Sequence, residues 1–188
     1  MKTSTDFLVA EMIERTRQNL NAAAHYKTLS DNQLNWRKAE GSWSVLECLE
    51  HLNLYGDFYL PEFDRRISNS KYTAERKFKS GMLGNYFAQS MLPKEKLNKM
   101  STFKDKNPAA SQLDKRTINR FIEQQKKMLV LLERARKVSL NRTKTSISIP
   151  LPVRLKLGDT FRFVIYHNYR HIVQAERVLK AQKTEVVA

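Results

Sequence analysis

Apolar positions recur at helical spacing in four long stretches of the chain. Residues 5–27 carry an apolar side chain every three or four positions, with charged side chains on the opposite face. The pattern returns over 44–67, over 111–138 and over 157–182. Each stretch predicts an amphipathic helix that buries one face. Four such helices with one long crossover, between the second and third, are typical of an all-α four-helix bundle.

The ends and interruptions of these helices can also be predicted. Ser44 and Glu47 fit a capping box, which places the start of the second helix. Pro61 lies deep in that helix, so we expect either a kink or an end near Leu60 followed by a restart. Ser111, three positions before Asp114, marks the expected start of the third helix. Residues 146–152 contain two prolines and are expected to be extended.

The connection between the second and third helices shows no sustained period. It spans residues 70–110 and is basic, with two glycines and two prolines. Because so long a bare loop is uncommon in a compact domain, we expect a short helix within it. Its candidate apolar residues are Met82, Leu83, Tyr86, Phe87 and Met91.

Length and composition limit the classes of protein. The 188 residues predict one domain, 1–188. A single cysteine, Cys48, excludes an intramolecular disulfide and a cysteine-rich zinc site. Only five glycines and five prolines argue against a β-sandwich and a glycine-rich phosphate loop. No apolar run approaches the roughly 18 residues of a membrane span. The start of the chain also lacks the apolar region of a signal peptide. We therefore expect a soluble cytoplasmic protein with no membrane partner.

The net charge of +15 leaves a nucleic-acid partner open. Counting Lys and Arg against Asp and Glu gives 8 − 10 = −2 over 1–70 and 9 − 3 = +6 over 71–110. The same count gives 10 − 3 = +7 over 111–144 and 7 − 3 = +4 over 145–188. The positive charge thus lies in the middle and the end of the chain. A basic field attracts polyanions, but by itself it does not establish a site.

Three of the four histidines suggest a metal site. His167 and His171 are four positions apart, so their imidazoles lie on one helical face, one turn apart. If the second and fourth helices are neighbours, His51 can complete a set of three nitrogens. Three neutral imidazoles with an open fourth position are typical of a catalytic zinc-type site. The alternative is a pair of surface or packed histidines. No glutamate lies between His167 and His171 as in zinc peptidases, so a peptidase is excluded.

Three segments carry a family resemblance: Gln33-Leu34-Asn35-Trp36-Arg37, Gly41-Ser42-Trp43-Ser44-Val45-Leu46-Glu47-Cys48-Leu49-Glu50-His51-Leu52 and His167-Asn168-Tyr169-Arg170-His171-Ile172-Val173-Gln174-Ala175. They resemble the DinB-like superfamily, of the DinB/YfiT type, a family of metal-dependent hydrolases and thiol transferases. The resemblance covers about residues 7–182 and is weakest in the basic middle. It implies a four-helix bundle and a divalent metal, zinc or nickel, on His51, His167 and His171. It also implies small-molecule substrates, with low-molecular-weight thiols such as bacillithiol, mycothiol or glutathione among them.

Several neighbours of the histidines have both a functional and a structural interpretation. Tyr55, one turn after His51, either points its hydroxyl into the cavity or packs in the core. Arg170 and Gln174 flank the histidine pair and could bind an anionic cosubstrate or reach the backbone. Glu47 either orients His51 or caps the helix.

Other residues near the motifs favour structural roles. Cys48 could approach the metal, but a buried apolar role fits a lone cysteine better. His25 is expected at the surface. Trp36 and Trp43 are expected to pack the loop onto the helices, with a wall of the substrate cavity as the alternative.

Two classes of function are compatible with these features. The first is an enzyme in which the metal activates a thiol or water for transfer to, or hydrolysis of, a small electrophilic substrate. The second is a non-enzymatic basic helical module that binds a protein or nucleic acid and keeps a vestigial or structural metal site. A homodimer remains open in both, because nothing in the sequence specifies an interface.

Overall fold

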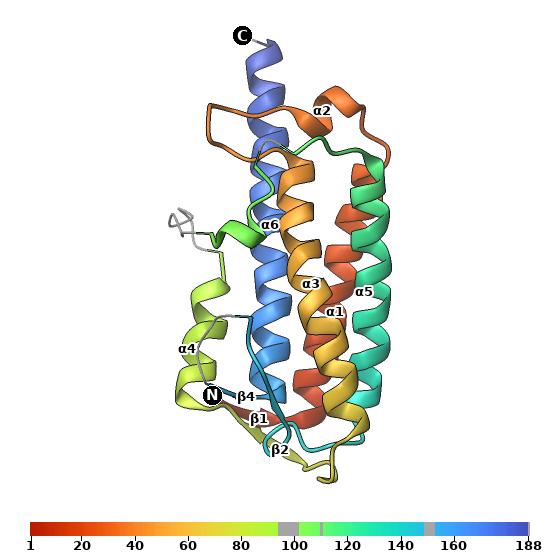
Figure 1. Cartoon of the computed structure of the whole chain (residues 1–188), viewed down its shortest axis with the longest axis vertical. Coiled ribbons are helices and arrows are strands. Elements are labelled where there is room, and N and C mark those ends of the chain that lie inside the picture. The colour runs from red at the N-terminus through yellow and green to blue at the C-terminus, as the bar shows by residue number, and fades with distance from the viewer. Residues whose placement is uncertain (94–101, 110, 149–152, 188) are drawn as a thin grey trace.

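The protein is mostly helical, as the hydrophobic pattern predicts (Figure 1). The computed structural model describes residues 1–93, 102–109, 111–148 and 153–187. Within these ranges the helices are α1 (Thr5–Tyr26), α2 (Asp31–Asn35), α3 (Val45–Ser68), α4 (Met82–Met91), the short 3₁₀ helix η1 (Lys104–Lys106), α5 (Lys115–Ala135) and α6 (Leu157–Val187). None of the helices in the described ranges is both long enough and apolar enough to cross a membrane.

The four long helices α1, α3, α5 and α6 lie side by side (Figure 1). Helix α3 packs against α5 and α6, and α1 packs against the same two helices. The apolar faces fill the space between them as two clusters, one around Phe63 and Phe161 and the other around Leu49 and Phe121. Helix α4, from the crossover, packs along α6.

Two small antiparallel sheets lie at one end of the helices (Figure 1). Strand β1 (Lys2–Ser4) pairs with β2 (Lys77–Lys79), and β3 (Lys144–Thr145) pairs with β4 (Leu155–Lys156). The all-α prediction omits these strands. At two or three residues each, they are too short to show the alternation that marks a strand in sequence.

Several predicted helix boundaries change in the structure. Helix α3 continues through Pro61, so an end near Leu60 with a restart is wrong. The residues around the proline, Leu60 and Phe63 among them, are buried, and their packing holds the helix together. Helix α5 begins at Lys115 rather than near Ser111, because the Asp114 side chain caps it by accepting a hydrogen bond from the backbone N–H of Arg116.

Among the predictions for the crossover, the loops and the end of the last helix, some are confirmed and others are not. The short helix expected in the crossover is present as α4. The pattern did not predict α2, which Ser30 and Gln33 cap reciprocally. Helix α6 extends past the expected end at 182, to Val187. Of the segment expected to be extended, residues 146–148 are outside any helix or strand, and 149–152 lie outside the described residues.

Candidate metal centre

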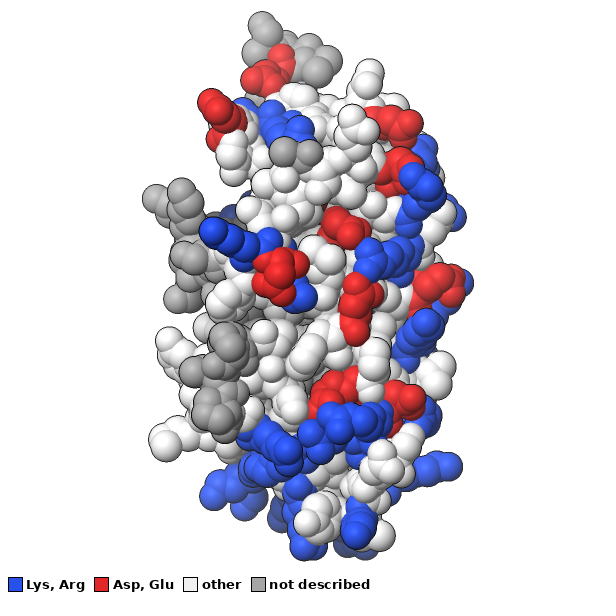
Figure 2. Space-filling model, viewed as in Figure 1, with Lys and Arg blue, Asp and Glu red and all other residues white. Residues whose placement is uncertain are grey.

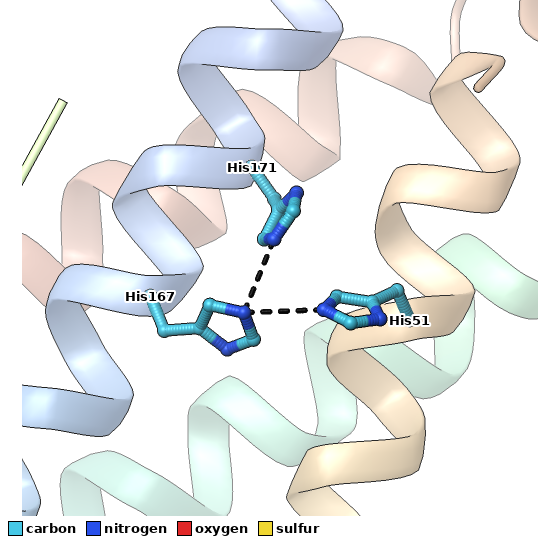
Figure 3. A group of neighbouring side chains, drawn as sticks. All are labelled: His51, His167 and His171. Atoms are coloured by element: carbon cyan, nitrogen blue, oxygen red, sulfur yellow. Dashed lines mark hydrogen bonds between the residues drawn. The ribbon is translucent and has the colours of Figure 1, made fainter. Parts of the chain in front are cut away.

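Three histidines from two helices point toward one another in the interior (Figure 3). His51 comes from the first half of α3, and His167 and His171 come from successive turns of α6. All three are buried, and their ligand atoms lie within 4.8 Å of one another. Because α3 packs directly against α6, the structure brings together the three residues that the sequence singled out.

The spacing of the nitrogens fits a small cation. Nε2 of His167 lies 3.1 Å from Nε2 of His51 and 3.1 Å from Nε2 of His171. Nitrogens about 2.0–2.1 Å from a tetrahedral zinc ion lie about 3.3 Å from one another. Three imidazoles are also a ligand set that zinc and nickel accept. The donor set therefore fits a divalent transition metal without rearrangement of the helices.

The partner of His51 fixes which of its ring nitrogens carries the proton. Nδ1 of His51 lies 2.7 Å from the backbone oxygen of Lys106, in η1. A carbonyl oxygen only accepts hydrogen bonds, so Nδ1 must donate. In the neutral ring the lone pair is then on Nε2, the atom that faces the other histidines.

His171 is held in the same way by a side chain. Its Nδ1 lies 2.9 Å from Oε1 of Gln174, one turn later in α6, and donates to that oxygen. The lone pair of His171 is therefore on Nε2 as well. Two lone pairs point at Nε2 of His167, which has one proton at most to offer them when neutral. A cation bound among the three nitrogens would accept the lone pairs that a single proton cannot satisfy.

The surroundings keep the three imidazoles neutral. Burial lowers the pKa of His51 to about 4, although the hydrogen bond to Lys106 acts in the opposite direction. Burial, with the neighbouring imidazoles and the Arg170 charge, lowers the pKa of His167 well below its usual range. Burial, with the His51 imidazole and the Arg170 charge, also lowers the pKa of His171 well below its usual range, although the hydrogen bond to Gln174 acts in the opposite direction. Metal binding requires neutral imidazole, so the site is ready for a metal at neutral pH.

Aromatic rings surround the histidines. The ring of Trp43 lies 4.8 Å from that of His51 and 5.7 Å from that of His171, between ring centres. Tyr55 meets His51 and His167 edge-on, at 5.0 and 4.8 Å. Phe163 stacks on His167 at 6.1 Å. Together these rings form an apolar wall around the donor atoms.

The three flanking residues named from the sequence lie beside the histidines. Tyr55 is half-buried, and burial raises the pKa of its hydroxyl to about 12. Arg170 is only 5 % exposed, and burial lowers its pKa. Gln174 accepts the hydrogen bond that orients His171, a role that the sequence did not suggest for it.

The structural interpretation holds for Glu47 and Cys48, whereas Trp43 fits the cavity-wall alternative. Glu47 caps α3 with Ser44 and pairs with Arg37, and the two ring nitrogens of His51 have other partners. Cys48 is fully buried among apolar side chains, and burial raises the pKa of its thiol. His25 is exposed, as expected. Trp43 does more than pack its loop, since it lines the histidines.

The sequence did not identify two contributors. The Lys106 carbonyl carries no signal, because every residue has one, and only the path of the crossover brings this one to His51. Phe163 has the spacing of a core residue, and its position one turn before His167 was the only indication of a role at the site.

A hollow of about 650 Å³ lies away from the histidines, on the outer side of α3 and α5. Gly56 and Pro61 line it from α3, and Val130 lines it from α5. None of the three histidines contributes to it.

Comparison with known proteins identifies a family. The family model described as DinB superfamily matches residues 12–175, which include α3, the crossover, all three histidines and most of α6. No curated protein and no solved structure matches the chain significantly.

Proposed function

The chain belongs to the DinB superfamily, and on that premise we propose that it is a metal-dependent enzyme built on a four-helix bundle of the DinB type. His51, His167 and His171 would hold one divalent ion, zinc or nickel. The reaction is the transfer of a thiol to a small electrophilic substrate, or the hydrolysis of that substrate by water. The observation that carries the proposal is the convergence of the Nε2 atoms of His51 and His171 on that of His167.

The protein's own contribution is a rigid, neutral donor set. The Lys106 carbonyl and the Gln174 side chain fix the tautomer and the ring orientation of two histidines. The wall of Trp43, Tyr55 and Phe163 excludes bulk water, which strengthens electrostatic interactions inside. The chemistry that a bound divalent ion supplies there is stabilisation of a thiolate or hydroxide at neutral pH.

Two further residues have roles in this proposal. Tyr55, whose pKa is raised to about 12, keeps its proton at neutral pH and can donate a hydrogen bond to a substrate or leaving group. The buried cation of Arg170 favours negative charge near His167 and His171, which suits an anionic low-molecular-weight thiol.

The second candidate is a binding module with a structural metal. The observation that favours it is the burial of all three histidines, together with a large surface hollow that lies elsewhere. A structural ion is held in a closed site, whereas a catalytic ion keeps a position for water or substrate. The accessibility of the metal to a thiol therefore separates the two functions.

The first test is metal content. Protein produced without a histidine tag is loaded with Zn²⁺, desalted and analysed by mass spectrometry of the metal. We expect about one ion per chain, its loss in His171→Ala, and full retention in the control His25→Ala, whose side chain is exposed. Full occupancy in His171→Ala would show that the ligand assignment is wrong.

The second test is reactivity. The zinc-loaded protein is mixed with glutathione, bacillithiol or mycothiol and a panel of small electrophiles, and loss of free thiol and hydrolysis of the electrophile are followed. We expect turnover by the loaded wild type and none by His171→Ala. A parallel sample is loaded with Co²⁺, and its absorption spectrum is recorded before and after thiol is added. One tightly held ion per chain, no turnover by the zinc-loaded protein and no spectral change of the cobalt-loaded protein would favour the binding module.

A further inference from the structure

The end of the molecule that carries the two sheets differs from the rest of the surface. We call it the sheet end and define it as residues 1–7, 71–86, 136–145 and 154–156. Helices α1, α4 and α6 begin there, and α3 and α5 lead into it (Figure 1). None of the three histidines belongs to it, so a role for this surface does not depend on the metal.

Cations without acidic partners crowd the sheet end. Ten of its lysines and arginines form no ion pair with any acid in the described ranges. The acids of this region are Asp6, which pairs with Arg136, and Glu75, which is held by Ser139 and Asn141. Figure 2 shows Lys and Arg side chains gathered at this end of the visible face. The ten are Lys2, Lys71, Arg76, Lys77, Lys79, Lys137, Arg142, Lys144, Arg154 and Lys156.

The sheets place some of these charges opposite one another. Lys2 is in register with Lys79 in the first sheet, and Lys144 is in register with Lys156 in the second. Directly opposed like charges destabilise an antiparallel pair. Lys156 Nζ donates to the backbone oxygen of Lys79 at 2.6 Å, but this bond leaves the four charges without a counterion, which an external anion would supply.

The same end carries most of the exposed large apolar side chains. Eight such side chains are exposed among the described residues, and only Phe103 and Val130 lie outside the sheet end. Met82, in the first turn of α4, is 94 % exposed, and Tyr86, one turn later, is 68 % exposed. A local concentration of exposed apolar groups marks an interaction surface. The six at the sheet end are Met1, Phe7, Tyr72, Met82, Leu83 and Tyr86.

We propose that the sheet end docks on the surface of a bilayer that contains anionic phospholipid. The lysines and arginines face the phosphate headgroups, and the first turn of α4, with Met82 and Leu83, enters the interface between headgroups and acyl chains. A nucleic-acid backbone would match the charge, and bases could stack on tyrosine. It offers less to the aliphatic side chains of Met82 and Leu83.

This association differs from the membrane contact that the sequence argued against. The expectation of no membrane partner was based on the absence of a spanning segment, and no described helix could span a bilayer. Docking from one side needs only a basic surface with a few apolar groups that can enter the interface, and the sheet end has both.

Vesicle co-sedimentation tests the proposal with the full chain. We expect binding to vesicles of phosphatidylcholine mixed with phosphatidylglycerol, no binding to phosphatidylcholine alone, and release at high salt. Lys77→Glu and Met82→Gln are each expected to weaken binding about fivefold or more. Both side chains are exposed, so the melting temperature should stay within error of the wild type.

Matched controls carry the same changes outside the sheet end. Lys127→Glu and Val130→Gln alter an exposed cation and an exposed apolar residue of α5, and both should bind as the wild type does. Equal weakening by these controls would overturn the proposal, as would the absence of binding to the anionic vesicles. Retention of a DNA duplex or single strand by a protein that ignores vesicles would assign the sheet end to nucleic acid instead.

Discussion

Two buried polar clusters occupy neighbouring parts of α6, and they differ in one respect. Near its start, Asp159 and Arg162 are both fully buried. The guanidinium of Arg162 has hydrogen-bond acceptors around it, and the carboxylate of Asp159 has donors. Arg162 donates to Ser80 and Asn85 at 2.9 and 3.1 Å, and Asp159 accepts from the backbone N–H of Gly81 at 2.8 Å. Further along the helix, the histidine cluster contains only neutral imidazoles, and the lone pairs of His51 and His171 both point at Nε2 of His167.

This difference indicates a structural role for the first cluster and a ligand-binding role for the second. The opposite charges of Asp159 and Arg162 balance inside the first cluster, although Nε of Arg162 is buried without a hydrogen-bond partner among the described residues, and the cluster ties the start of α4 to α6. The contact is close, since a Cβ at Gly84 would lie 2.6 Å from the Asp159 side chain. In the second cluster the converging lone pairs of His51 and His171 share at most one proton, that of His167. A buried cluster that is incomplete by itself is a candidate for a ligand.

The largest expected effect comes from breaking the charge-balanced cluster of Asp159 and Arg162. Arg162→Met leaves Asp159 buried without its cation, and we expect a loss of about 3–5 kcal/mol in the free energy of unfolding. Urea unfolding followed by circular dichroism measures it. A loss below about 1 kcal/mol would show that this cluster does not anchor α4.

The histidine cluster should make the metal-free protein less stable to unfolding in acid. The folded-state pKa values of the three histidines lie below the ordinary 6.5, at about 4 for His51. The unfolded chain therefore binds more protons as the pH falls from about 6.5 toward 4, and stability falls with it. Urea midpoints in EDTA at pH 7 and pH 5 should show this loss.

Two variants assign the acid sensitivity to the cluster. His171→Leu removes one of the groups and should reduce the loss between pH 7 and pH 5. His25→Leu, at an exposed position, should leave it unchanged. An equal pH response in all three proteins would place the acid-sensitive groups elsewhere.

Removing an orienting contact should act on the metal and spare the fold. Gln174→Leu deletes the acceptor of His171 Nδ1, and we expect Zn²⁺ affinity to fall about 10–100-fold with little change in the melting temperature. Competition with a chromophoric chelator measures the affinity. The control Gln18→Leu, at an exposed site on α1, should match the wild type.

The smallest effect is expected at the surface. Arg134 pairs with Asp64 between α5 and α3 in contact with solvent, so Arg134→Met should cost at most about 1 kcal/mol. The same urea titration as for Arg162→Met makes the comparison direct. A cost as large as that of Arg162→Met would mean that burial does not distinguish the two ion pairs.

Much of the fold could be predicted because it depends on local periodicity. The apolar spacing located the four long helices, and Ser44 with Glu47 fixed the start of α3. The sequence failed where long-range packing decided the outcome. Helix α3 runs through Pro61 because its neighbours are buried, and β1 pairs with β2 across more than seventy residues.

The candidate metal centre likewise has one feature that the sequence determines and others that depend on tertiary structure. The spacing of four between His167 and His171 determines that they share a helical face, because 3.6 residues make one turn. Gln174 orients His171 from the next turn of the same helix, whereas tertiary structure alone decided that His51 faces the pair and that the crossover brings the Lys106 carbonyl to its ring. Helical periodicity is a property of neighbouring residues, whereas these contacts depend on how α3, α6 and the crossover pack together.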